Sequence, residues 1–368
     1  MTSLYSPIQL GELSLRNRVF MAPLTRNRAY VDGTPGQWAP TYYRQRSSAG
    51  LIITEATQIS AMGKGYLDTP GIYLPEHVTG WRKIVDAVHG NGGRIFLQLW
   101  HVGRISHSSL LPDNAQPVAP SAVRARSRTV TDRGFVDVSE PRALTLGEIE
   151  TTIDDYRRAA ANAKVAGFDG VEVHAANGYL IDQFLQSSTN LRTDRYGGSV
   201  SNRLRFLLET AQAVLQVWNA DQVGIRLSPR GTFNDMGDED PEATFTAAVR
   251  ELAELRLGYL HMVEASPGDA APSRKSRNLF DRLRREWPGL YIANGGYDGP
   301  DGEQAIKDGR ADAIAYGRAF IANPDLPRRL ELRTALNEPD ETTFYGGSER
   351  GYVDYSTWDE SIAAECGG

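Results

Sequence analysis

Eight short apolar segments recur along this chain of 368 residues, separated by turns and by segments with helical periodicity. Such alternation of strands and helices produces a parallel sheet with right-handed crossovers. Eight strand–helix units favour closure into a (β/α)₈ barrel, an α/β fold, over the alternative of an open doubly wound sheet. The expected strands are Val19–Ala22, Leu51–Glu55, Ile95–Trp100, Gly170–His174, Val223–Leu227, Tyr259–Glu264, Tyr291–Ala293 and Ala311–Tyr316.

The chain is interpreted as one TIM-barrel domain over residues 1–368, with a C-terminal tail from about 337 to 368. Asp240-Pro241 has the composition of a helix start, because Asp is a good N-cap and Pro is favoured in the first turn. Residues 102–145, after the third strand, form a long insertion rich in Ser, Pro and Arg. Insertions of this length are usually functional, so this one is expected to act as a lid over a site.

Polar side chains occupy inward positions near the ends of three expected strands. Because side chains alternate along a strand, Gln98, His174 and Arg226 face the barrel interior while their apolar neighbours face the helices. Burying such groups without partners would cost several kcal/mol each. Either an internal network satisfies them, with Arg226 pairing Glu172, or a polar ligand binds there. Active sites of such barrels lie at this end of the strands.

Glycines follow the last two strands, in Ala293–Gly296 and in Tyr316-Gly317-Arg318. Glycines at these positions let backbone amides approach an anion, and the loops after strands 7 and 8 are the usual phosphate site of the barrel. Arg318 could add a charged fork. The sequence contains neither the Gly-x-Gly-x-x-Gly fingerprint after a strand nor a phosphate-loop motif, which argues against a resident dinucleotide on a Rossmann unit.

Composition excludes several classes of protein. A net charge of -6 argues against a general nucleic-acid binder. The N-terminus lacks the apolar core of a signal peptide, and no apolar run is long enough to span a membrane, so a cytoplasmic protein is expected. Cys366 is the single cysteine, which excludes an internal disulfide and a Cys-ligated iron–sulfur cluster. His101 and His107 have no evident third ligand, so no metal is expected.

Several stretches match one family of proteins. They are Asn17–Arg26, Leu51–Ser60, Leu97–His107 and Val171–Ser199, together with "VGIRLSP" at Val223, "ANGG" at Ala293, "AYGRAFIANPDLPRR" at Ala315 and "FYGGSERGYVDY" at Phe344. The chain resembles the old yellow enzymes from about Leu4 to Tyr355. This resemblance implies a TIM barrel that binds FMN non-covalently and uses NADPH or NADH as a transient electron donor.

The resemblance also implies roles for individual residues around the flavin. Thr25 would hydrogen-bond the flavin C4 carbonyl, Gln98 would meet the pyrimidine edge, and Arg226 would lie near N1 and O2, where negative charge builds. The residues implied to line the isoalloxazine ring are Pro23, Leu24, Thr25, Ala56 and Gln98. Those implied to hold the phosphate are Gly295, Gly296, Gly317 and Arg318. Thr25 as a simple helix cap is the alternative.

A second group of residues is implied to act on the substrate. His174 and Asn177 would bind the carbonyl or nitro oxygen, and Tyr179 would protonate the α-carbon. Asn177 stands where some family members carry a second histidine. Tyr66, Trp100 and Tyr345 would shape the pocket. The alternatives are that Trp100 is plain core and that Tyr179 is only a pocket wall.

The function that follows is that of a nicotinamide-dependent flavin ene-reductase. Hydride would pass from flavin N5 to the β-carbon of an α,β-unsaturated carbonyl compound, a maleimide or a nitroalkene, in a ping-pong order, with nitrate esters as a further substrate class. A monomer or homodimer is expected. Two other hypotheses are an aldolase-like or isomerase barrel without flavin and a non-catalytic flavin-binding module.

Overall fold

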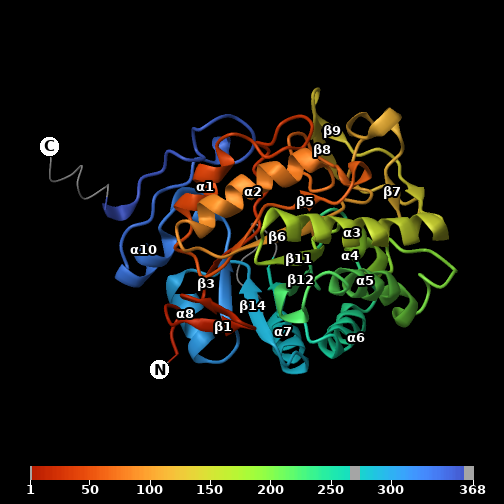
Figure 1. Cartoon of the computed structure of the whole chain (residues 1–368). Coiled ribbons are helices and arrows are strands. Elements are labelled where there is room, and N and C mark those ends of the chain that lie inside the picture. Colours follow the sequence, from red (N-terminus) through yellow and green to blue (C-terminus); the bar gives the residue numbers. More distant parts are fainter. Residues whose placement is uncertain (1, 266–273, 360–368) are drawn as a thin grey trace.

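The computed structural model describes residues 2–265 and 274–359. Its centre is a closed barrel of eight parallel strands, which confirms the fold predicted from the sequence (Figure 1). Each strand pairs with the next along the chain, and the last pairs with the first. The strands are β3 (Val19–Met21), β4 (Ile52–Ile53), β6 (Ile95–Trp100), β11 (Gly170–Ala175), β12 (Val223–Leu227), β13 (Tyr259–Val263), β14 (Leu290–Asn294) and β15 (Ala313–Tyr316).

The second barrel strand is shorter than the predicted Leu51–Glu55, because side chains replace its ladder partners. The Thr54 hydroxyl accepts a hydrogen bond from the Gln98 backbone N–H at 3.1 Å. The Glu55 N–H donates to the Tyr43 hydroxyl at 3.0 Å instead of to a strand. Pairing with β6 resumes in β5 (Thr57–Gln58).

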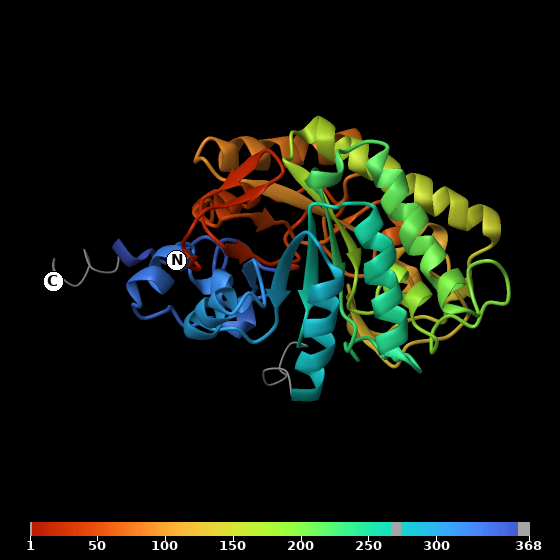
Figure 2. The same cartoon turned by 90° about the horizontal axis from the view of Figure 1, so that it is seen from below.

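Helices cover the outside of the barrel, as the two views in Figures 1 and 2 show. Asp240 accepts a hydrogen bond from the Ala243 N–H at 3.0 Å and Pro241 opens the helix, which confirms that predicted start. The helices are α1 (Ala39–Gln45), α2 (Pro75–His89), α3 (Leu146–Ala166), α4 (Leu180–Leu185), α5 (Val200–Leu215), α6 (Pro241–Glu254), α7 (Arg274–Glu286), α8 (Gly299–Lys307), α9 (Arg318–Ala322) and α10 (Leu326–Leu332).

Strand side chains divide into two buried clusters, as alternation predicts. The cluster that includes side chains of the covering helices contains the alternating strand residues Ile95, Leu97, Leu99, Val171, Val173, Ala175, Val223, Ile225 and Leu227. The interior cluster contains Phe20, Phe96 and Tyr259. Complete burial of each Val, Leu or Ile side chain contributes about 1.5–3 kcal/mol relative to exposure, so this outer cluster is a large stabilising contribution.

A short hairpin contributes to the interior of the barrel. It consists of β1 (Ile8–Leu10) and β2 (Leu13–Leu15), and its Leu10 and Leu15 pack in the interior cluster. Gly224 on β12 makes room for the ring of Tyr259, because a Cβ at this position would lie 2.0 Å from that ring. The interior is therefore a packed core. The inward polar side chains near the carboxyl ends of the strands lie beyond this core and can form a site.

Residues 102–145 fold into two small sheets beside the barrel. They contain a parallel pair, β7 (Val118–Ala119) with β10 (Arg142–Ala143), and a hairpin of β8 (Arg128–Thr131) with β9 (Gly134–Asp137) (Figure 1). Arg126 contacts Asp235, in the loop after β12, with side-chain nitrogen–oxygen distances of 2.8 and 3.0 Å. The insertion is thereby tied to a loop at the carboxyl ends of the strands.

The segment before residue 359 returns to the start of the barrel. Arg26 donates to the carbonyls of Phe344 and Gly351 at 2.9 and 2.8 Å, and its guanidinium lies 5.1 Å from the ring centre of Tyr352. This contact holds residues 343–351 beside the residues that follow β3. Cys366 lies outside the described residues.

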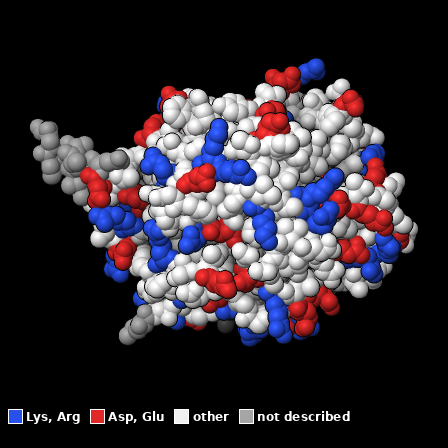
Figure 3. Space-filling view, viewed as in Figure 1, with Lys and Arg blue, Asp and Glu red and all other residues white. Residues whose placement is uncertain are grey.

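The described surface carries charges of both signs. On the face in Figure 3, Lys and Arg side chains lie among Asp and Glu side chains, and uncharged surface separates many of these groups. Within residues 2–265 and 274–359, no helix is long and apolar enough to cross a membrane.

Candidate active site

Three of the predicted residues, Gln98, His174 and Arg226, lie together where neighbouring strands end. Strand register places Glu172 opposite Gln98 and His174 opposite Arg226, so three strands bring these inward groups to adjacent levels. Gln98, His174 and Arg226 are buried, with exposed fractions of 1%, 3% and 7%. Arg226 donates to Asn294 Oδ1 at 2.8 Å. Among the described residues no ion pair joins Arg226 to Glu172, so the direct partner of the guanidinium is an amide on β14 instead of the carboxylate considered as the alternative.

Aromatic side chains surround the phenol of Tyr179. The Tyr179 ring meets the rings of Trp100 and His174 edge-on, with centroid distances of 5.0 and 5.1 Å. Tyr66 stacks on Trp100 at 5.8 Å, and the Tyr66 and Tyr179 hydroxyls lie 3.3 Å apart. Four of the predicted residues thus form one compact group, in which Tyr66 is a direct hydrogen-bond partner of Tyr179.

Asn177 lies in a tight turn between β11 and α4. Its φ of 58° is left-handed, which Asn tolerates better than most residues. The Asn177 backbone N–H donates to the Ser228 hydroxyl at 2.7 Å, and the Gly178 N–H donates to Asp182 Oδ2 at 2.8 Å. These contacts fix the backbone from which the Asn177 side chain projects.

Burial sets the protonation of the two central groups. It lowers the pKa of His174 well below the ordinary value, and the charge of Arg226 lowers it further, so the imidazole is neutral at neutral pH. Burial raises the pKa of Tyr179 to about 12, against a smaller opposing effect of Tyr66. The site therefore offers a neutral imidazole and a phenol that keeps its proton.

Three buried nitrogens at this level have no hydrogen-bond partner among the described residues. They are His174 Nδ1, Trp100 Nε1 and Arg226 Nε. Burial lowers the pKa of Arg226, and Glu172 counteracts that effect. A guanidinium nevertheless stays protonated at neutral pH. A fixed cation with an unused donor suits a ligand that carries or develops negative charge.

The predicted phosphate residues lie after β14 and β15. Gly295 has a φ of 128°, and a Cβ there would lie 2.5 Å from the Ala265 nitrogen, so only glycine fits without a shift. A Cβ on Gly317 would approach a Leu24 methyl at 3.3 Å. The Arg318 side chain is largely exposed and lies 3.8 Å from Glu341, where it is accessible to a ligand.

The remaining predicted residues differ in exposure. Ala56 is buried at 5%, whereas Pro23, Leu24 and Thr25 are partly exposed after β3. Tyr345 is 68% exposed and lies in the segment held by Arg26. The structure brings the first four to the strand ends and leaves Tyr345 on the surface of its loop.

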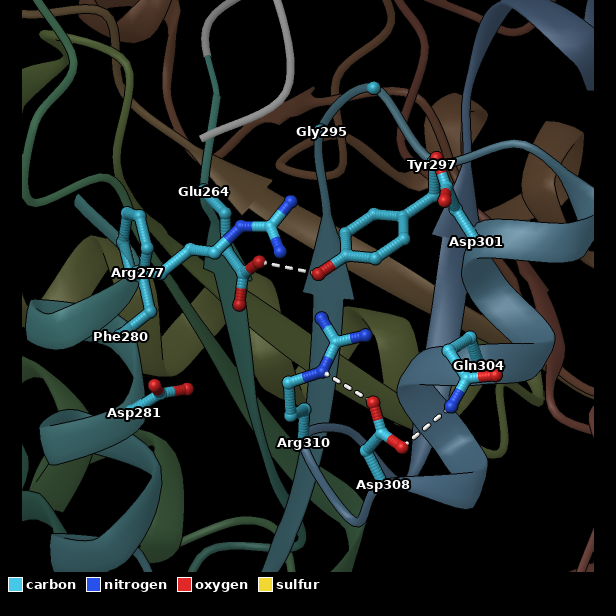
Figure 4. Close-up of a pocket in the computed structure, with 11 residues that line it drawn as sticks. Glu264, Arg277, Phe280, Asp281, Gly295, Tyr297, Asp301, Gln304, Asp308 and Arg310 are labelled. Atoms are coloured by element: carbon cyan, nitrogen blue, oxygen red, sulfur yellow. Dashed lines mark hydrogen bonds and ion pairs between the residues drawn. The ribbon is translucent and has the colours of Figure 1, made fainter. Parts of the chain in front are cut away.

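A cavity of about 310 Å³ lies beside Gly295 and Gly296, in the turn after β14 (Figure 4). Of the predicted site residues it contains Gly295 and Gly296, and its other lining residues are Glu264, Arg277, Phe280, Asp281, Tyr297, Asp301, Gln304, Asp308 and Arg310. Glu264 accepts hydrogen bonds from the phenols of Tyr291 and Tyr297 at 2.8 and 2.6 Å. The cavity adjoins the predicted phosphate turn but not the group around Tyr179.

Asn234, after β12, is a site residue that sequence reasoning missed. It is buried at 6%, and its Nδ2 donates to the Asn177 carbonyl at 2.9 Å, while its Oδ1 accepts from the Ser127 hydroxyl at 3.0 Å. Burial raises the pKa of the Tyr66 and Tyr179 phenols, and hydrogen bonding with Asn234 opposes that rise. No periodic pattern marks it, and its position in a loop after a barrel strand is the one available signal.

The two histidines of "HVGRISH" have local structural roles. His101 Nδ1 accepts from the Gly103 N–H at 3.1 Å, and burial lowers its pKa to about 3. His107 Nδ1 accepts from the Ser109 N–H at 3.2 Å. Among the residues the structure describes, no group of three or more His, Cys, Asp or Glu side chains is placed to hold a metal.

Comparison with known proteins gives consistent results. The model of the NADH:flavin oxidoreductase / NADH oxidase family matches residues 3–337. 12-Oxophytodienoate reductase 1 of Oryza sativa subsp. japonica is 46% identical over 360 residues, which cover 97% of this chain and 93% of that protein. The structure of morphinone reductase is 49% identical, with a TM-score of 0.93 and coverage of 98% of this chain and 97% of the other. Its complex with tetrahydroNAD is 48% identical, with a TM-score of 0.92 and coverage of 98% and 99%.

Proposed function

The chain belongs to the NADH:flavin oxidoreductase / NADH oxidase family, the old yellow enzymes, and from that premise we propose how its own residues act. Members of this type use FMN and NAD(P)H to reduce activated C=C bonds, and the chain is such an FMN-dependent oxidoreductase. The observation that carries the residue-level proposal is the meeting of His174, Asn177 and Tyr179 beside Gln98 and Arg226.

The donor set at the strand ends fits FMN. Arg226 Nε is buried without a partner among the described residues, and Gly295 has no room for a side chain. We propose that Gln98 and Arg226 hold the pyrimidine edge of the flavin and that Thr25 hydrogen-bonds its C4 carbonyl. The ring would also contact Pro23, Leu24 and Ala56, and the phosphate would be held by Gly295, Gly296, Gly317 and Arg318. When bound, FMN supplies the hydride.

Substrate activation is assigned to His174 and Asn177. A neutral imidazole and a carboxamide both donate hydrogen bonds, and His174 keeps a donor because one ring nitrogen carries the proton. Two donors on one carbonyl or nitro oxygen withdraw electron density from the β-carbon and stabilise the negative charge that develops on that oxygen. The fixed turn around Asn177 means that little reorganisation is needed at that moment.

Protonation of the α-carbon is assigned to Tyr179. Its pKa of about 12 keeps the phenol protonated in the working pH range, which a general acid requires. Tyr66 and Asn234 hydrogen-bond with the hydroxyl, and Trp100 packs against the ring that carries it. Together with Tyr345, Tyr66 and Trp100 would also limit the shape of the substrate.

We propose that NADH or NADPH and the alkene occupy this pocket in turn, which gives ping-pong kinetics, and that residues 102–145 act as a lid. Enones, maleimides and nitroalkenes are the proposed substrates, with nitrate esters as a second class. The aldolase-like alternative is set aside because it has no use for a flavin, and the three inward groups at the site are Gln, His and Arg.

The test is an anaerobic absorbance titration of the purified protein with NADPH or NADH and then with 2-cyclohexenone. A flavin band that bleaches with the nucleotide and returns with the enone supports the proposal. Comparison of the two nucleotides gives the donor preference. A band that bleaches but does not return would remove enones as substrates, and the absence of a band after incubation with FMN would refute the proposal.

A further inference from the structure

A carboxylate lies inside the barrel directly next to Gln98. Glu172, on β11, has no exposed surface. Its Oε1 accepts a hydrogen bond from Gln98 Nε2 at 2.6 Å, and its Oε2 contacts His261 Nδ1 at 2.8 Å. Gln98 comes from β6 and His261 from β13, so the carboxylate connects strands on both sides of its own. The proposed roles of the active-site residues make no use of Glu172 or His261.

The protonation states of this group follow from its charges. Burial acts to raise the pKa of Glu172, but the interactions with His261 and Arg226 outweigh it and leave the pKa below the ordinary value. Burial lowers the pKa of His261 despite the nearby carboxylate. Glu172 is therefore ionised at neutral pH, and His261 is a neutral imidazole whose Nδ1–H points at it.

An ionised carboxylate can only accept hydrogen bonds, and this fixes the orientation of Gln98. The NH₂ group of the Gln98 amide must face Glu172, so its carbonyl oxygen faces the other way. A flavin presents an N–H donor on its pyrimidine edge. The orientation that Glu172 imposes thus makes Gln98 an acceptor for that donor.

The same carboxylate balances the charge of Arg226. Arg226 is 7% exposed, and Glu172 is the first group that favours its charged form against burial. With both imidazoles neutral, the inward groups named here carry one negative and one positive charge. Removal of the negative charge would leave the guanidinium uncompensated, and such charges act strongly where water is excluded.

We propose that Glu172 is a positioning residue that sets the reduction potential of the bound flavin, by orienting Gln98 and by offsetting the charge of Arg226. The inference rests on the proposed placement of FMN against these two residues. Without Glu172, the positive charge of Arg226 would stabilise the reduced, negatively charged flavin more strongly.

The experiment is measurement of the flavin midpoint potential by anaerobic spectroelectrochemistry in the FMN-loaded wild type and in Glu172→Gln. Gln has nearly the same shape, removes the negative charge and replaces one of the two acceptor oxygens with a donor. We expect the two-electron equilibrium to move at least tenfold toward the reduced flavin, which corresponds to a rise of about 30 mV. Glu172→Asp keeps the charge and should stay closer to the wild type than Glu172→Gln.

The matched control is Phe96→Leu, which changes an inward apolar side chain on β6 without any charge. Its potential should stay near that of the wild type. A change below tenfold in Glu172→Gln, or an equal change in Phe96→Leu, would overturn the inference while the flavin still binds. Should Glu172→Gln not fold, Glu172→Gln/His261→Gln, which pairs one amide with another, is measured against the same criterion. A wild-type protein that binds no FMN even after incubation with it would refute the proposed function and this inference together.

Discussion

Replacement of Tyr179 by Phe isolates the proton that this side chain is proposed to deliver. The ring of Tyr179 packs edge-on against Trp100 and His174, and a Phe ring can keep both contacts. What is lost is one hydroxyl, with its 3.3 Å contact to the Tyr66 hydroxyl and its hydrogen bonding with Asn234. The shape of the pocket should therefore survive, and the kinetic effect should report the chemistry of the hydroxyl.

The size of that effect follows from general acid catalysis, which contributes about 10²- to 10⁴-fold. We expect Tyr179→Phe to slow reoxidation of the reduced enzyme by 2-cyclohexenone by about this factor. Reduction of the flavin by NADPH needs no proton from Tyr179 and should change by less than about threefold, because the Phe ring keeps the contacts with Trp100 and His174 and only the proton-transfer step loses a group. Anaerobic stopped-flow absorbance measures the two half-reactions separately.

The pH dependence gives an independent check. The pKa of Tyr179 is raised to about 12, so the protonated, active form is present below that value. Reoxidation of the wild type by the enone should therefore not decrease between about pH 6 and 9 through ionisation of this phenol. Tyr66→Phe is the control, because it removes the neighbouring hydroxyl but leaves the proposed acid. Equal loss in both half-reactions of Tyr179→Phe, or a loss as large in Tyr66→Phe, would refute the assignment.

Three further changes test other parts of the site. His174→Ala should weaken enone binding by about tenfold or more, since one charge-stabilising donor is lost, and an unchanged Kd in a binding titration would contradict its role. Burial raises the pKa of Asp182 from 3.8 to about 7, so the native state binds a proton that the unfolded chain releases between these two values. The unfolding free energy, measured by urea denaturation, should therefore fall between about pH 4 and 7 by on the order of 4 kcal/mol at most, and by less in Asp182→Asn. Gly295→Ala should weaken FMN binding in a fluorescence titration and lower the free energy of unfolding by more than about 1 kcal/mol, because the φ of Gly295 is 128° and a Cβ there would meet Ala265. The control is Gly198→Ala, where φ is also positive but the space is open, and this change should leave the FMN affinity unchanged.

The barrel was predictable because strands buried on both faces appear as short apolar runs. Alternation within those runs also identified Gln98, His174 and Arg226, and the same rule applied to β13 would have placed His261 inside. The predicted length was wrong at the second strand, because the Thr54 hydroxyl, and not a backbone group, accepts the hydrogen bond of the Gln98 N–H. Hydrogen bonds from side chains to the backbone leave no periodic signal in a sequence.

Asn234 shows why the rest of the site was not predictable. Its contacts join residues more than fifty positions away, namely Asn177 through its carbonyl, and Ser127 of the insertion. Asn234 itself has a left-handed φ of 62°, a conformation that a non-glycine residue keeps only when its surroundings hold it. Such a network depends on how loops meet in space, which local propensity does not encode.

The same contacts give the insertion a physical route to the substrate. Ser127 and Arg126 of the insertion bind the adjacent residues Asn234 and Asp235, both in left-handed conformation, and Asn234 in turn binds the turn that carries Asn177. A shift of the insertion therefore changes the support of a residue proposed to bind the substrate oxygen. The loop after β12 couples the proposed lid to the proposed oxygen-binding pair, although no residue of that loop was predicted to have a role.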